Sequence, residues 1–175
     1  MSRLSAGFIG HDYPIMLDLG DLDPVAMTLQ ESVRFELGDG TDESVDKTWG
    51  TLFANPPGLG RVHFGENERI LTATFVHQLH CVRELARAFH SPKSNLVTVE
   101  HQQHCLTYLR QTFLCEAADT LEEGDFMQRD FDVDRIGGTA VCWDWERVYE
   151  LMGTNYHEWK ARRKDSERAS YSHEL

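Results

Sequence analysis

The chain has 175 residues, 41% of them hydrophobic, and a formal net charge of −12. This length predicts one domain over residues 1–175, long enough to build a single hydrophobic core. The acidic balance argues against nucleic acid as a partner, because phosphate binding requires lysine and arginine gathered on one face. No stretch approaches the ~20 apolar residues of a membrane-spanning helix. We therefore expect the chain as given to be soluble, without a transmembrane segment.

The first 70 residues carry turn signals and little helical periodicity. Residues 1–30 are predicted to form an irregular N-terminal arm, since Pro14 and Pro24 restrict the residues that precede them. Residues 31–70 are predicted to be loops with short strands, of which Arg61-Val62-His63-Phe64 is the clearest. The expected fold thus has a loop-rich N-terminal third.

The two clearest predicted helices span residues 74–90 and 98–118, and a last helix spans 143–165. The fold class is therefore mainly α, a small helical domain in which the first two helices carry the motifs described below. The short connection between them favours neighbouring, antiparallel helices. Residues 119–141 are predicted to be an acidic loop that includes Asp130, Asp132 and Asp134, and residues 166–175 a frayed tail.

A five-residue pattern, His-x-x-His-Cys, occurs twice in the chain. His77-Gln78-Leu79-His80-Cys81 is followed 24 residues later by His101-Gln102-Gln103-His104-Cys105. Residues three and four apart share one face of a helix, so each copy places two imidazoles and a sulfur side by side. A single His-x-x-His pair on a helix is usually just two surface histidines, but two copies of the motif in a small chain indicate metal binding.

Helical-wheel positions separate the histidines from the apolar residues of each helix. The predicted apolar stripes contain Phe75, Leu79, Val82, Ala86 and Phe89 in the first helix, and Leu106, Leu109 and Phe113 in the second. The histidines lie largely opposite these stripes. If the stripes pack on the core, the two histidine faces are free to meet each other or to line a cleft.

The predicted metal ligands are His77, His80, His101 and His104. Imidazoles without carboxylates favour copper or zinc, with copper preferred here, and iron remains an alternative in which Glu84 supplies the carboxylate. The four histidines can form one four-coordinate site or two half-sites. Candidate orienting groups are Gln78, Gln103, Glu84 and Tyr108; Tyr108 and Glu84 are also the candidate catalytic residues. His63, His90 and His157 are expected to be structural or exposed.

The four cysteines allow either metal ligation or disulfide bonds. As thiolates, Cys81 and Cys105 could complete a metal site, whereas disulfides would protect the sulfurs from copper and oxygen. We favour disulfides and predict a Cys115–Cys142 pair, because both residues lie outside the histidine motifs. Closing that loop could stabilise the fold by roughly 3 kcal/mol in the chain-entropy model.

Three separated blocks resemble the UstYa-like oxidases of fungal secondary metabolism. They are the double His-x-x-His-Cys motif, the stretch Tyr108-Leu109-Arg110-Gln111 with Cys115-Glu116-Ala117-Ala118-Asp119, and Cys142-Trp143-Asp144-Trp145. The blocks appear in the family's order, and the resemblance covers about residues 49 to 157.

The resemblance implies a copper-dependent enzyme that uses molecular oxygen to tailor a peptide or other small metabolite. The outcomes associated with the family are oxidative cyclisation, hydroxylation, dehydrogenation and halogenation. It also implies the secretory pathway lumen or secretion, and a homo-oligomer or a heterodimer with a homologue. The four motif histidines and Cys81 and Cys105 carry over residue by residue.

The sequence departs from the family pattern at two points. Members commonly begin with a transmembrane helix, which this chain lacks, and many have a histidine two residues before the late cysteine, where this chain has Ala140. The alternative function is therefore a non-catalytic partner subunit of an active homologue, stabilised by metal or disulfides.

Overall fold

The computed structural model describes residues 16–32, 34–37, 43–54, 57–65, 68–90, 97–119, 121, 128, 130 and 132–172. Its elements in chain order are β1 (Pro24–Gln30), α1 (Glu43–Ala54), β2 (Arg61–Phe64), β3 (Arg69–Thr72), α2 (Thr74–His90), α3 (Val99–Glu116), β4 (Ile136–Trp143) and α4 (Glu146–Ser172). Four helices against four short strands confirm the mainly α fold class. None of the helices in the described ranges is long and apolar enough to cross a membrane.

The described residues divide into two compact units that the chain enters in turn. The first unit lies within Met1–Gly20, Phe53–His77 and Glu146–Leu175, and the second within Asp21–Leu52 and Gln78–Trp145. The boundary after His77 passes through α2, which is unbroken there, so α2 is described with the second unit. The prediction of one domain stays a prediction.

In the first unit, α4 packs on the β2–β3 hairpin. The two strands pair antiparallel from Arg61 opposite Thr72 to Phe64 opposite Arg69. Asn155 on α4 accepts a hydrogen bond from the His63 backbone N–H at 2.7 Å and donates one to the His63 carbonyl at 2.9 Å. This amide thus serves the strand as a neighbouring strand would. Val62 and Met152, each 1% exposed, form the centre of this packing.

A glycine at the start of β2 permits the close approach of the hairpin to the first turn of α2. Gly60 has a φ of +72°, and a Cβ at this position would collide with the side chain of Val76. Its carbonyl accepts a hydrogen bond from the Ala73 N–H at 3.3 Å. Because only glycine adopts this conformation without strain, the position fixes where β2 begins.

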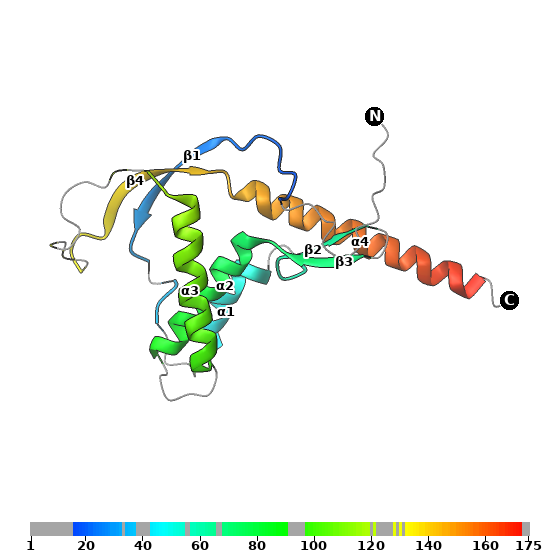
Figure 1. Ribbon diagram of the computed structural model, residues 1–175, viewed down its shortest axis with the longest axis horizontal. Coiled ribbons are helices and arrows are strands. Elements are labelled where there is room, and N and C mark those ends of the chain that lie inside the picture. The colour runs from blue at the N-terminus through cyan, green and yellow to red at the C-terminus, as the bar shows by residue number, and fades with distance from the viewer. Residues whose placement is uncertain are drawn as a thin grey trace. The chain divides into compact units, whose positions relative to one another are not determined.

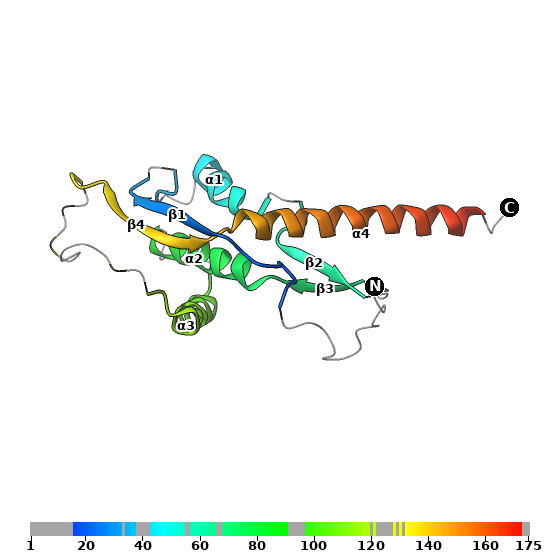
Figure 2. The same ribbon diagram turned by 90° about the horizontal axis from the view of Figure 1, so that it is seen from above.

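In the second unit, β1 and β4 form an antiparallel ribbon (Figures 1 and 2). The register runs from Pro24 opposite Trp143 to Gln30 opposite Ile136, with an irregularity between Thr28 and Gln30. A 3.1 Å hydrogen bond joins the hydroxyls of Thr28 and Thr139 across the strands. The ribbon brings together segments more than 100 residues apart in the sequence.

The helices α2 and α3 are neighbours, as predicted, but they cross at an angle and do not run antiparallel (Figures 1 and 2). Thr98 caps α3, because its hydroxyl accepts a 3.2 Å hydrogen bond from the backbone N–H of His101. Helix α3 ends at Ala117, whose left-handed backbone brings its N–H to the Phe113 carbonyl at 2.9 Å. The cap places the second motif within the first turns of α3.

Several segments differ from the predicted elements. Residues 24–30, expected to be irregular, form β1, and the predicted 119–141 loop ends in β4, which includes Gly137 and Gly138. Helix α1 replaces predicted loop, whereas β3 is one of the short strands expected in this region. Helix α4 begins three residues later than predicted and continues to Ser172, into the segment predicted to fray. The 74–90 helix and the 61–64 strand are confirmed at both ends.

Candidate metal centre

The two motifs face each other across the contact between α2 and α3. The rings of His80 and His101 lie 5.5 Å apart, centroid to centroid. One donor atom each from His77, Cys81 and His104 lies within 4.8 Å of the others. Each motif therefore contributes to two groupings that cross between the helices, and all four predicted ligand histidines take part.

The two motif cysteines form the buried centre of this contact. Cys81 and Cys105 are both 0% exposed, and Leu109, Leu85 and Tyr108 pack against them. Burial, together with a hydrogen bond between the protonated Cys81 thiol and the Cys105 sulfur, raises the pKa of Cys81 to about 12. At neutral pH this sulfur is a protonated thiol, so the imidazoles are the ready donors of the site.

The motif histidines remain partly accessible around the buried sulfurs. His104 is exposed, and His77, His80 and His101 are half-buried. Burial lowers the pKa of His80, an effect that the nearby Glu84 carboxylate partly opposes. His80 is therefore a neutral imidazole at neutral pH, the form that binds a metal.

The predicted apolar stripes do not cover a core, which corrects the helical-wheel reading. Phe89 is 71% exposed, Phe113 62% and Leu106 52%, whereas Leu109 alone of the second stripe is buried. The helices meet instead through the motif faces, with Cys81, Cys105 and Leu109 at the contact. The expectation that the histidine faces are free to meet each other is confirmed.

The residues of the two His-x-x-His-Cys motifs fit a metal that prefers nitrogen ligands. Four imidazoles from two helices suit copper or zinc, and the donor group of His77, Cys81 and His104 contains no carboxylate. Tyr108 lies next to this group, with its ring 6.1 Å from that of His104. The amides of Gln78 and Gln103, predicted to orient the histidines, bond instead to Glu116 and Thr107.

A comparison with known proteins shows the family to which the chain belongs. Residues 43–163 match the family model described as mycotoxin biosynthesis protein UstYa. The chain belongs to the UstYa family. The match extends well beyond the motif helices, from the start of α1 to the exposed part of α4.

Three curated UstYa relatives show the same relationship at low identity. The chain is 35% identical to the oxidase ustYa of Aspergillus flavus over 101 residues, covering 56% of this chain and 46% of that protein. It is 32% identical over 102 residues to the UstYa family oxidase phomYb of Diaporthe leptostromiformis, covering 57% and 39%. The UstYa family oxidase phomYe of the same organism is 23% identical over 117 residues, covering 59% and 41%.

The chain spans less than half the length of these curated UstYa relatives. No solved structure matches the chain. The comparisons therefore show the family, and what the relatives' names say of activity belongs to those proteins.

The remaining cysteines lie away from the motif. Cys115 is exposed on the last turn of α3 and Cys142 is half-buried in β4, and both are free thiols, like Cys81 and Cys105. The predicted Cys115–Cys142 disulfide is therefore wrong for this structure. Of the spare histidines, His157 is exposed, His63 is 8% exposed in the first unit, and the side chain of His90 lies outside the described residues.

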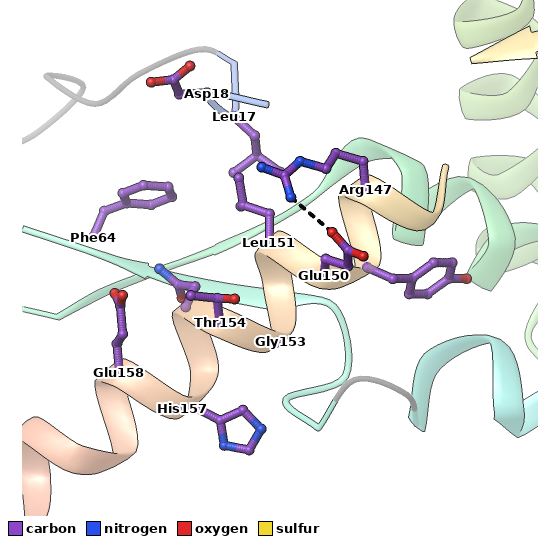
Figure 3. Close-up of a pocket in the computed structure, with 12 residues that line it drawn as sticks. Leu17, Asp18, Phe64, Arg147, Glu150, Leu151, Gly153, Thr154, His157 and Glu158 are labelled. Carbon is purple, nitrogen blue, oxygen red and sulfur yellow. Dashed lines mark hydrogen bonds and ion pairs between the residues drawn. The ribbon is translucent and has the colours of Figure 1, made fainter. Parts of the chain in front are cut away.

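Sequence reasoning missed a hollow in the first unit (Figure 3). It has a volume of about 720 Å³ and lies between residues 17–18, Phe64 and one face of α4. Leu17 and Leu151 give it an apolar floor, and Arg147 pairs with Glu150 at 2.9 Å at its edge. The hollow combines segments more than 80 residues apart, so no local pattern reveals it.

Proposed function

We propose that this chain is a copper-dependent oxidase that tailors a product of secondary metabolism. The observation that carries the proposal is the meeting of the two His-x-x-His-Cys motifs face to face, with His80 and His101 rings 5.5 Å apart. Membership of the UstYa family and the oxidase names of three relatives support the same reaction class.

The chemistry divides between the metal and the chain. Copper held by imidazoles supplies one-electron redox chemistry with molecular oxygen as the co-substrate. The chain contributes imidazole ligands on two helices, a buried pair of cysteine sulfurs beside them, and access from solvent at His104. His77, His80, His101 and His104 are the proposed ligands, and Tyr108 lies close enough to contact a bound substrate. Zinc and iron are the alternative metals.

The proposed substrate is a small molecule or peptide, bound in the lumen of the secretory pathway or outside the cell. The described part of the 119–141 segment includes exposed Asp130, Asp132 and Asp134. A substrate next to these carboxylates would be neutral or cationic. Much of this segment lies outside the described residues, so its position as a wall of the site stays a prediction.

A non-catalytic partner subunit is the second candidate, and one residue favours it. Ala140 on β4 occupies the position where many family members have a histidine. If that histidine is needed for turnover, this chain would bind metal and act only beside a homologue.

Oxygen consumption separates the two candidates. The full chain, produced through the secretory pathway and loaded with copper, is mixed with ascorbate in an oxygen electrode. An oxidase consumes oxygen faster than the same amount of free copper, and His101→Ala loses this excess. A wild-type rate no higher than that of His101→Ala contradicts the oxidase and leaves the partner subunit.

A further inference from the structure

A buried carboxylate lies beside one of the motif histidines. Glu84 is 5% exposed, one helical turn after His80 on α2. Its Oε1 lies 3.9 Å from Nδ1 of His80, too long for a hydrogen bond but within ion-pair range. A carboxylate is rarely left buried unless it is paired, so its position needs an explanation.

Arginines on α2 fix this carboxylate through a contact with α1. Arg87 donates from Nη1 to Glu84 Oε1 at 3.0 Å, and from Nε to Asp46 Oδ1 at 3.1 Å. Arg83 donates to the same Asp46 oxygen at 2.6 Å. The rigid guanidinium of Arg87 thus bridges two carboxylates, which sets where the Glu84 oxygen can lie.

The carboxylate is placed to choose which nitrogen His80 presents to the motif site. Because Nδ1 faces Glu84, a proton on Nδ1 has an acceptor nearby, and Nε2 keeps its lone pair. Histidines that bind metals commonly direct their second nitrogen to a carboxylate, which fixes the tautomer and the ring orientation. The nearest motif imidazole on α3 is that of His101, whose ring centroid lies 5.5 Å from the centroid of His80.

We propose that Glu84 is a positioning residue for His80, held by Arg87 and Asp46, and that His80 binds metal through Nε2. The inference rests on the proposed copper site. It assigns Glu84 a role different from that of a metal ligand, because the oxygen that lies nearest to His80 is the one that Arg87 holds. It also gives α1 a part in the site, through a residue that sequence reasoning did not select.

The first experiment uses the metal-free protein. Histidine labelled with ¹⁵N reports by NMR which ring nitrogen carries the proton. We expect His80 to carry it on Nδ1 in the wild type, and Glu84→Gln to shift His80 toward the Nε2–H form. Glu116→Gln is the matched control, since it also removes one negative charge from the helix pair and lies on the exposed end of α3. A wild-type His80 with its proton on Nε2 overturns the proposal.

The second experiment measures copper affinity by competition with a chromophoric chelator, and the Cu(II) environment by electron paramagnetic resonance. Glu84→Gln should weaken copper binding roughly 10–100-fold and change the hyperfine pattern, as loss of an orienting partner does. Glu116→Gln should bind like the wild type. Circular dichroism checks that each variant is folded.

Arg87→Lys separates positioning from direct ligation and remains informative if Glu84→Gln fails to fold. Lysine keeps the charge but cannot bridge Glu84 and Asp46, so positioning predicts weaker copper binding than in the wild type. If Glu84 were itself a ligand, releasing it from arginine would leave copper affinity unchanged or stronger, which contradicts the proposal. A wild-type chain that binds no copper refutes the proposed function as well. A copper-binding chain indifferent to Glu84→Gln refutes this inference alone.

Discussion

Histidine occupies two contrasting environments in this molecule. On α2 and α3, the motif histidines cluster with one another around buried cysteines, and His104 is exposed. In the first unit, His63 is 8% exposed and stacks on Trp159, with ring centroids 4.1 Å apart and planes 9° apart. The first arrangement leaves imidazole nitrogens near one another, and the second uses the ring as packing surface. Clustering of accessible imidazoles, rather than burial of one, marks the candidate site.

Alanine substitutions at His63 and His104 test this difference between the two environments, and the largest effect is expected here. His63→Ala removes a stacked, buried ring and should lower the free energy of unfolding by about 2–4 kcal/mol. His104→Ala removes an exposed ring and should change it by less than about 0.5 kcal/mol in metal-free protein. Denaturant unfolding of both variants tests this. Equal losses would mean that His104, too, is a packing residue.

The Asn155 amide tests whether His63 is held through its backbone. Asn155→Ala leaves the N–H and carbonyl of His63 without their partner and should cost about 1–3 kcal/mol of unfolding free energy. Thr154→Ala, at the exposed neighbouring position on α4, should cost less than about 0.5 kcal/mol. If the two variants have the same free energy of unfolding in urea, the hydrogen bonds of the Asn155 amide do not stabilise the fold.

The sequence predicted the motif helices well because their signals are local. Periodic apolar residues define α2, and Thr98 starts α3 through a cap that is readable from the sequence. The ribbon was missed, since β1 and β4 pair residues more than 100 positions apart and each strand alone resembles a loop.

The sequence indicated which histidines come together, but not which residues hold them in place. Repetition of the motif indicated the four histidines, and helical spacing placed them on common faces. A helical wheel does not show which face of a helix meets its partner. The wheel therefore predicted Phe89 and Phe113 to be buried, but both are exposed. Asp46 lies 41 residues from Arg87, and nothing near it in the sequence indicates that contact.

The reactivity of the cysteines distinguishes the buried centre of the contact between the motifs from its exposed surroundings. Iodoacetamide should label the exposed Cys115 thiol first, and Cys81 and Cys105 only on unfolding, as peptide mapping of the labelled protein would show. Burial raises the pKa of Cys81 to about 12, so its thiol stays protonated at pH 8 and labelling is slow even where reagent enters. Rapid labelling of Cys81 in folded protein would contradict its burial.

The smallest expected effect concerns the anchor between α1 and α2. Hydrogen bonding to Arg83 lowers the pKa of Asp46, with Arg87 acting in the same direction against partial burial. A lowered pKa stabilises the fold above the unfolded-state value near 4, and this contribution disappears as the pH falls through the folded-state pKa. Asp46→Asn should therefore cost about 0.5–1 kcal/mol at pH 7, limited by solvent screening, and progressively less below about pH 4.

Thermal unfolding across pH measures this difference directly. Glu43→Gln is the control, because Glu43 pairs with the exposed Lys47 and should give a smaller effect. A gap between wild type and Asp46→Asn that stays constant down to pH 2 would mean that the Asp46 charge plays no part.

Copper content per chain tests the central claim most directly. Elemental analysis after copper loading and dialysis should find stoichiometric copper in the wild type and almost none in His77→Ala or His104→Ala, both folded by circular dichroism. Full copper occupancy in both variants would contradict a centre built from the paired motif faces.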